Sequence, residues 1–286
     1  MKKKLILASA LSLSLALAAC NGNDDKENGG TDATEGLETN IVTIATGGAS
    51  GPYNIIGTTL ADQYVKEFDV NSRTQTTGAS VENINLLEQG KAEMAFVMSD
   101  ALSQAVNGEV SFKEPIKNVS QIATLYPNVV QIITKEGSGI KTIEDLKGKR
   151  IAVGDQNSGV EINARVLLNG HGITYEDVKV DYLGYAEAAD GLKAGTIDAA
   201  FLTSGLPNAS VMELAETTGI QLVSVNAEKV AEIAKEHPYF ISYDIAVDTY
   251  KNEEAITTAA VPNALVVRTD MSEDDVYDLT KKFFES

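Results

Sequence analysis

Glycines and small hydroxyl residues follow several short apolar runs of this chain, and they recur in its second half. Ser50-Gly51 and Ser158-Gly159 are 108 residues apart, and each pair stands between a β-type run and a helical pattern. At such a junction the first backbone N–H groups of the helix lack partners and carry a partial positive charge, which suits a carboxylate or a phosphate. The chemistry that these residues offer is therefore the binding of a small polar solute.

The candidate ligand-binding residues all lie in such loops or are aromatics beside them. In the first half of the chain they are Gly48, Ser50, Gly51, Tyr53, Gly78, Ala79, Ser80, Ser99 and Tyr126. In the second half they are Asn157, Ser158, Gly159, Tyr185, Ala186 and Ser204. The serines can instead be helix caps, although a capping serine can still contact a ligand. Tyr53 and Tyr126 can equally belong to the core or to a hinge. Arg165 is expected to pair with a neighbouring acid rather than with a ligand.

The loops contain no familiar catalytic or cofactor motif. Residues 47–51 lack the Gly-Lys-Ser/Thr ending of a P-loop and the spacing of a dinucleotide fingerprint. The chain has no Gly-x-Ser-x-Gly nucleophile motif. Its single cysteine, Cys20, leaves His171 and His237 without the partners of a usual zinc site. We therefore expect no enzyme, no cofactor and no such metal site; a buried carboxylate-rich Ca²⁺ or Na⁺ site stays open.

The composition is that of a globular protein with an acidic balance. Of 286 residues, 43% are hydrophobic and 22% are charged, and the formal net charge is −18. Proteins that bind nucleic acids or anionic lipid surfaces normally show basic patches, so neither is an expected partner. The length suits one large domain or two ordinary ones.

The N-terminal segment has the pattern of a secretory signal. Three lysines, at positions 2–4, precede an apolar run from Leu5 to Ala19 that is short for a membrane span. Leu17–Cys20 resembles the lipobox of bacterial lipoproteins, which implies a signal peptide over residues 1–19, a lipid on Cys20 and anchoring at the extracytoplasmic face of the cell membrane. An ordinary signal peptide with an incidental cysteine is the alternative. Residues 20–40 are expected to comprise the lipidated cysteine and a disordered tether, because the polar stretch after Cys20 cannot bury a core.

Alternating strand-like and helix-like segments must position the candidate loops. β-type runs are expected over 41–46, 70–76, 94–98, 151–154, 178–182 and 199–202, with helical patterns between them. Leu87–Ser99 matches Leu192–Ser204 at an offset of 105 residues, with leucine, glycine, an acid, Ala-Phe and a final serine in common. The alternation predicts parallel α/β sheets, and the offset predicts two lobes of like topology. Alternatively, the match reflects only what helix ends and buried strands favour.

A hinge is expected to join the two lobes, with the ligand cleft between them. Strands at 122–125 and 129–134 flank Tyr126-Pro127-Asn128, and a strand at 264–269 precedes a helix with a capping-box pattern at Ser272 and Asp275. Lobe one is expected to comprise 41–132 plus 258–286, and lobe two 133–257. Ligands of open α/β sheets bind beyond the carboxyl ends of the strands, and two lobes can close around a ligand by a hinge motion.

Taken together, these segments resemble the TAXI family of solute-binding proteins, the extracytoplasmic receptors of TRAP transporters. The segments that carry the likeness are 46–53, 77–83, 95–100, 125–127, 140–154, 158–165, 188–192 and 198–201. The resemblance implies a type II periplasmic-binding-protein fold and no catalysis. It also implies capture of a small organic anion, such as a carboxylate, or a glutamate-like amino acid. That solute would pass to TRAP-type membrane permease subunits driven by a cation gradient.

Two features depart from the family pattern. Residues 155–157 read Asp-Gln-Asn where small residues are expected, which leaves the identity of the ligand open. The chain stops at Ser286, soon after Phe284, where family members continue with a further helical segment, so a shortened first lobe is expected. A receptor that serves an ATP-driven importer or a membrane sensor is the alternative function.

Overall fold

The computed structural model describes residues 36–286. The predicted signal peptide, the predicted lipid attachment at Cys20 and most of the predicted tether lie outside the described residues. Within residues 36–286, no helix is both long enough and apolar enough to cross a bilayer.

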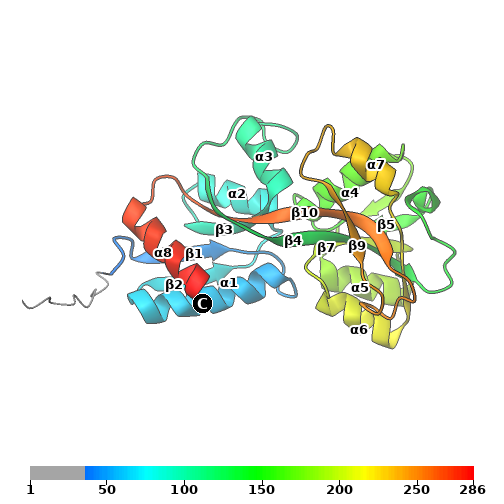
Figure 1. The fold of residues 1–286 in the computed structure, drawn as a ribbon, viewed down its shortest axis with the longest axis horizontal. Helices are drawn as coiled ribbons and strands as arrows, with labels where there is room; N and C mark the ends of the chain where they lie inside the picture. Colours follow the sequence, from blue (N-terminus) through cyan, green and yellow to red (C-terminus); the bar gives the residue numbers. More distant parts are fainter. Residues whose placement is uncertain (1–35) are drawn as a thin grey trace, which may run out of the picture. The chain divides into compact units, whose positions relative to one another are not determined.

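The described chain builds one ten-stranded mixed sheet with helices on both of its faces (Figure 1). The strands are β1 (Ile41–Ala45), β2 (Asn71–Gln75), β3 (Met94–Met98), β4 (Ser120–Lys135), β5 (Arg150–Ala152), β6 (Lys179–Asp181), β7 (Ala199–Ser204), β8 (Ile220–Leu222), β9 (Ile241–Ile245) and β10 (Ile256–Val267). The α-helices are α1 (Pro52–Phe68), α2 (Ser80–Glu88), α3 (Ser99–Asn107), α4 (Gly159–Gly170), α5 (Tyr185–Ala194), α6 (Ala209–Thr217), α7 (Ala227–Ile233) and α8 (Glu273–Glu285). A 3₁₀ turn covers Ile143–Leu146.

The strand order confirms two α/β lobes of like topology. Along the sheet the order is β2-β1-β3-β10-β4-β7-β5-β6, which has the same pattern when read from either end. In each lobe three parallel strands lie beside one long antiparallel strand, which is β10 in the first lobe and β4 in the second. The repeat at an offset of 105 residues therefore marks corresponding elements, with Phe96 on β3 and Phe201 on β7 both buried.

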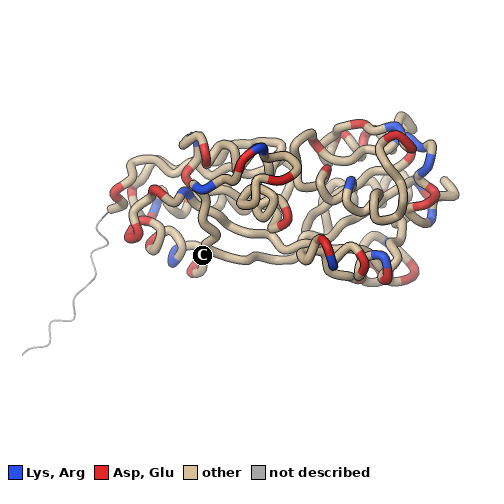
Figure 2. Tube along the Cα trace, turned by 90° about the horizontal axis from the view of Figure 1, so that it is seen from above, with Lys and Arg blue, Asp and Glu red and all other residues tan. Residues whose placement is uncertain are grey.

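The two long strands join the lobes and pair with each other. The expected strands at 122–125 and 129–134 are one continuous strand, β4, and the expected strand at 264–269 begins earlier, as β10. Pro127 does not interrupt β4, because it faces Pro262 of β10 and neither proline has an N–H to leave unpaired. Figure 2 shows how few charged residues these joining strands hold; Lys135 is the only one on β4 or β10.

The first described residues pack against the last helix. Leu37 contacts the hydrophobic core of lobe one, and the amides of Glu38 and Thr39 donate to the Asp275 carboxylate over 2.7 and 2.9 Å. Ser272 Oγ accepts from Asp275 N at 3.2 Å, as the capping pattern predicts, but Asp275 does not bond back to Ser272. The carboxylate instead holds residues 38–39, which the sequence pattern placed in the tether.

Candidate functional site

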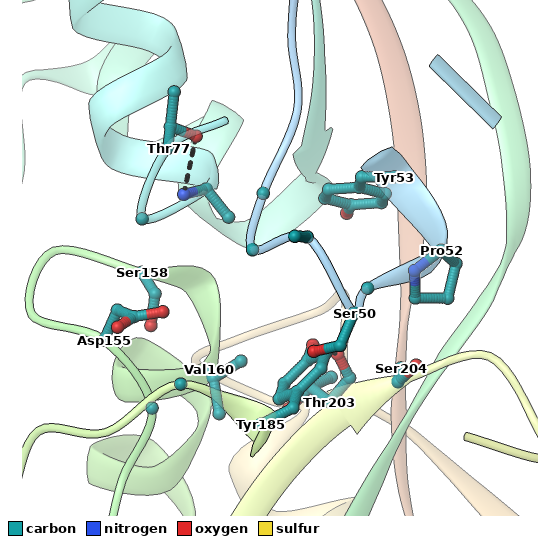
Figure 3. A pocket seen from close by; sticks show the side chains of 18 of the residues that line it. Ser50, Pro52, Tyr53, Thr77, Asp155, Ser158, Val160, Tyr185, Thr203 and Ser204 are labelled. Atoms are coloured by element: carbon teal, nitrogen blue, oxygen red, sulfur yellow. Dashed lines mark hydrogen bonds between the residues drawn. The ribbon is translucent and has the colours of Figure 1, made fainter. Parts of the chain in front are cut away.

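A cavity of about 440 Å³ lies where the carboxyl ends of strands from both lobes meet. Lobe one contributes the loops after β1 and β2, together with Met98 of β3. Lobe two contributes the loops after β5 and β6 and the end of β7, and Tyr126 and Asn128 come from the joining strand β4. Figure 3 shows side chains from both lobes around this space. We call this cavity the cleft; its size suits a small organic solute.

The loop after β1 brings backbone and a free hydroxyl to the cleft. Pro52 is the first residue of α1, where its missing N–H costs nothing. Gly51, not Ser50, is the N-cap, and no side chain caps this helix. The alternative reading of Ser50 as a helix cap is therefore wrong, and Ser50 lines the cleft (Figure 3).

Tyr53 forms part of the wall and of the core at once. Its side chain is 6% exposed and stacks on Phe96, with ring centroids 5.3 Å apart. Its hydroxyl donates to Asn263 Oδ1 and accepts from Asn128 Nδ2 at 3.4 Å. Burial, followed by the nearby Tyr126, Tyr185 and Asp100, raises the pKa of Tyr53 well above its ordinary value. The hydroxyl is a fixed, neutral group rather than an acid or base.

The loop after β2 is held by buried hydrogen bonds. Thr77 Oγ1 donates to Asn83 Oδ1 at 2.6 Å and accepts from Ala79 N at 2.9 Å. Asn83 in turn donates to the carbonyl of Thr46 at the end of β1. Ala79 has a positive φ of 75°, a costly conformation for alanine that these bonds sustain. Gly78 N donates to Glu82 Oε2 at 2.7 Å.

In lobe two, the loop after β5 places a serine and a carboxylate differently. Ser158 Oγ accepts from Glu161 N at 3.1 Å and caps α4. Asp155 lies at the cleft, and burial, then Glu187 and Glu82, raises the pKa of its carboxyl above the ordinary value of 3.8. Asn157, between them, is exposed and has a positive φ of 63°.

The start of α5 and the end of β7 complete the second wall. Tyr185 Oη donates to the carbonyl of Thr203 at 2.6 Å, and burial raises the pKa of this phenol. Ala188 N is the first amide with a bond within α5, to Gly184 O at 2.9 Å, so the amides of Tyr185 to Glu187 precede the helical ladder. Burial also raises the pKa of Tyr126 to about 12.

Most candidate residues gather at this cleft. Those that line it are Gly48, Ser50, Gly51, Tyr53, Gly78, Ala79, Tyr126, Ser158, Tyr185, Ala186 and Ser204. Ser80, Ser99, Asn157 and Gly159 are not among its lining residues. Ser80 is fully buried, and its hydroxyl accepts from Met98 N at 3.0 Å. Gly159 packs against the side chains of Ser80 and Met98.

Other lining residues were not among the candidate ligand-binding residues, although Thr203 lies in a candidate loop and Asp155 was noted as a departure from the family pattern. They include Thr77, Asn128, Asp155, Val160, Glu187 and Thr203. Asp155 directly follows a predicted strand, which is the signal that marks such positions, whereas nothing in the sequence sets Glu187 apart from other helix acids. Arg165 pairs with Glu161 over 3.3 Å, as expected. Within residues 36–286, no group of three or more His, Cys, Asp or Glu side chains could hold a metal ion.

The comparison with protein families decides the relationship. The model of the NMT1-like family matches residues 44–286. The chain belongs to the NMT1-like family. The matched range includes every lining residue of the cleft, so both walls of the site lie within the family region of this NMT1-like protein.

Solved structures of low sequence identity share the fold. A protein from Bordetella bronchiseptica RB50 has a TM-score of 0.62 at 18% identity, covering 88% of this chain and 72% of that one. The aliphatic sulphonate binding protein SsuA from Escherichia coli has a TM-score of 0.52 at 16% identity, covering 86% and 72%. PhnD1 from Prochlorococcus marinus, solved with methylphosphonate, has a TM-score of 0.56 at 12% identity, covering 86% and 83%. These likenesses confirm the periplasmic-binding-protein fold.

Proposed function

We propose that this NMT1-like protein is an extracytoplasmic solute-binding protein of a TRAP-type secondary transporter. It captures a small carboxylate or a glutamate-like amino acid and delivers it to the membrane permease. The observation that carries the proposal is the cleft between two lobes of like topology, lined by the starts of helices from both. Such a site binds a polar solute without a catalytic group, so the proposed role is binding and not an enzyme reaction.

The lobe boundaries and the anchor belong to the same proposal. Lobe one comprises residues 41–132 plus 258–286 and lobe two residues 133–257, with β4 and β10 as the hinge strands. The lipid on Cys20 holds the protein at the outer face of the cell membrane, near its permease. The E. coli protein of the same fold is named as an aliphatic sulphonate binding protein, and the P. marinus protein was solved with methylphosphonate. Both support a role for this protein in binding a small solute.

Ligand-dependent stabilisation tests the binding function. A solute at one hundred times its dissociation constant stabilises the folded state by about 2.7 kcal/mol, and each kcal/mol raises the Tm of a chain of this size by about 2–4 °C. We expect such a shift with at least one of a panel of amino acids, amines and small dicarboxylates on ligand-free protein. Unchanged melting across the panel would contradict the proposal.

A substitution in the lobe-one loop assigns the binding to this cleft. Ser50→Arg places a long side chain in the cleft at a residue that caps no helix, so we expect the ligand-induced shift to disappear while the protein stays folded. Thr58→Arg, at an exposed position on α1, the helix that follows Ser50, is the matched control and keeps the shift. An unchanged shift in Ser50→Arg would place the ligand elsewhere.

The type of transporter is tested by the energy source of uptake. A TRAP-type partner predicts that uptake stops when the cation gradient is dissipated, and that a multi-span permease gene lies beside this one. Uptake that persists without the gradient and stops on ATP depletion would favour the alternative, a receptor for an ATP-driven importer. A neighbouring sensor kinase gene, without uptake, would favour a membrane sensor.

A further inference from the structure

The charges at the cleft are of one sign. Among the lining residues, Asp155 and Glu187 are the only ones with charged side chains, and none is Lys, Arg or His. A receptor that selects a dicarboxylate needs cations or many free donors to offset two negative charges. This cleft instead presents two carboxylates of its own.

The carboxylates converge on one part of the cleft. A Cβ atom placed on Gly184 would lie 2.8 Å from Glu187 Oε2 and 3.3 Å from Asp155 Oδ2, so both side chains border the same spot. From the opposite lobe, a Cβ atom placed on Gly78 would lie 3.3 Å from Glu82 Oε2 and 3.6 Å from Asp155 Cβ. Three acids from α2, the β5–α4 loop and α5 therefore face one another across the lobe boundary.

No cation of the described chain neutralises these acids. Every ion pair within residues 36–286 involves other carboxylates, at Glu67, Glu93, Glu161, Asp181, Glu216, Glu232 and Asp270. The direction of the Asp155 pKa agrees, since burial, and then the neighbouring Glu187 and Glu82, raise it above its ordinary value. A bound cation would relieve this repulsion, because an opposite charge within about 4–6 Å favours the ionised carboxylate.

Two hydroxyl groups of lining residues give an independent indication that the cleft binds a polar solute. Thr203 is fully buried, yet its Oγ1 has no hydrogen-bond partner, and the buried Tyr126 Oη has none either. Both residues line the cleft. A buried hydroxyl without a partner costs free energy. Hydrogen bonds from these two hydroxyls to a solute would remove that cost and would offset the desolvation of the polar groups of the solute.

We propose that the bound solute carries a positively charged amine, held by Asp155 and Glu187, while the hydroxyls of Tyr126 and Thr203 bind its polar remainder. This inference rests on the proposed receptor function, but it departs from the small carboxylate or glutamate-like amino acid named there. It favours an ω-amino acid, a basic amino acid or a diamine over a dicarboxylate, and it disfavours glutamate because glutamate would bring a second carboxylate to an acidic wall.

A series of matched chain length tests the charge preference. The probes are glutarate, 5-aminopentanoate and 1,5-diaminopentane, with succinate, 4-aminobutanoate and 1,4-diaminobutane as the four-carbon set, and glutamate, glutamine and lysine. Calorimetry on the ligand-free full chain should show an amine-bearing probe binding at least about tenfold tighter than the dicarboxylate of equal length. Tighter binding of the dicarboxylate or of glutamate would overturn the inference and leave the receptor function standing. Binding of no probe would count against both.

Isosteric variants tie the preference to the two carboxylates. Asp155→Asn and Glu187→Gln should each weaken the amine-bearing probe about tenfold and reduce its advantage over the dicarboxylate. Glu213→Gln, at an exposed position on α6, is the matched control and leaves both affinities unchanged. Melting curves without ligand verify folding. An unchanged amine-to-dicarboxylate ratio in both folded variants would overturn the assignment.

Discussion

The two lobes of this protein share a topology but contribute different chemistry to the cleft. Each has three parallel strands beside one long antiparallel strand, and the order is the same from either end of the sheet. Lobe one lines the cleft with glycines, hydroxyls and the Tyr53 ring, without a charged side chain. Lobe two adds Asp155 and Glu187. A repeated fold thus fixes where loops meet, while individual residues decide what the loops bind.

The lobes also meet away from the cleft, through a buried polar pair. Asn163 Nδ2 of α4 donates to Asp100 Oδ2 of α3 over 2.6 Å, and both side chains are buried. Asn163 Oδ1 has no partner. Burial raises the pKa of Asp100 from 3.8 to about 7, against the hydrogen bonds that lower it. No charged side chain contributes to the shift in the pKa of Asp100. Asp100 in turn helps to raise the pKa of Tyr53.

The largest effect is expected at this junction, from Asp100→Asn. The folded carboxyl keeps its proton to about pH 7, whereas the unfolded one releases it near 3.8. Stability therefore falls as pH rises between those values, by up to about 4 kcal/mol. Asn stays neutral, and its amide can donate to Asn163 Oδ1, so the variant should lose this pH dependence and be more stable at pH 8. Denaturant unfolding at pH 5 and pH 8 measures both.

The exposed Asp62→Asn on α1 is the control, and it should keep the pH dependence of the unchanged protein. If Asp100→Asn showed the same fall in stability between pH 5 and pH 8, Asp100 would be ionised in the folded state. The contact between the lobes would then be a charged one.

The repeated topology could be predicted from the sequence, since alternating apolar runs and the offset match report local periodicity. The continuity of β4 could not, because Pro127 reads as a break until its partner strand places Pro262 opposite it. The site was predicted where it depends on loops at strand ends, as for Ser50 and Tyr185. The predicted lining differs where it depends on how the lobes meet: Ser80 and Gly159 were included although they pack against Met98, and Glu187 was missed because only the fold brings it to Asp155.

A smaller effect is expected from alanine at the two equivalent glycines. A Cβ on Gly159 would lie 2.6 Å from Met98 Sδ and 2.9 Å from Ser80 Oγ, both from lobe one. Overpacking of this kind costs about 1–3 kcal/mol, and because it opposes contact between the lobes, Gly159→Ala should weaken ligand binding by about tenfold or more. Calorimetry and denaturant unfolding measure the two effects.

Gly51→Ala provides the comparison within lobe one. Its Cβ would meet Gly48 O at 3.2 Å and Tyr185 Cε2 at 3.5 Å, which is a much milder contact. We expect less than about 1 kcal/mol of destabilisation. If both variants lost the same free energy of unfolding, the packing at Gly51 and at Gly159 would be equally tight, which would contradict this comparison.

The smallest effect separates the two serines that the repeat makes equivalent. Ser158 Oγ accepts from Glu161 N at 3.1 Å, whereas α1 has Gly51 as its N-cap and no side-chain cap. Loss of a capping hydroxyl costs about 1 kcal/mol, so Ser158→Ala should lower the free energy of unfolding by that amount. Ser50→Ala should leave it within about 0.5 kcal/mol and weaken only ligand binding. Denaturant unfolding and calorimetry on both variants decide this, and equal stability losses would mean that Ser50 supports its helix after all.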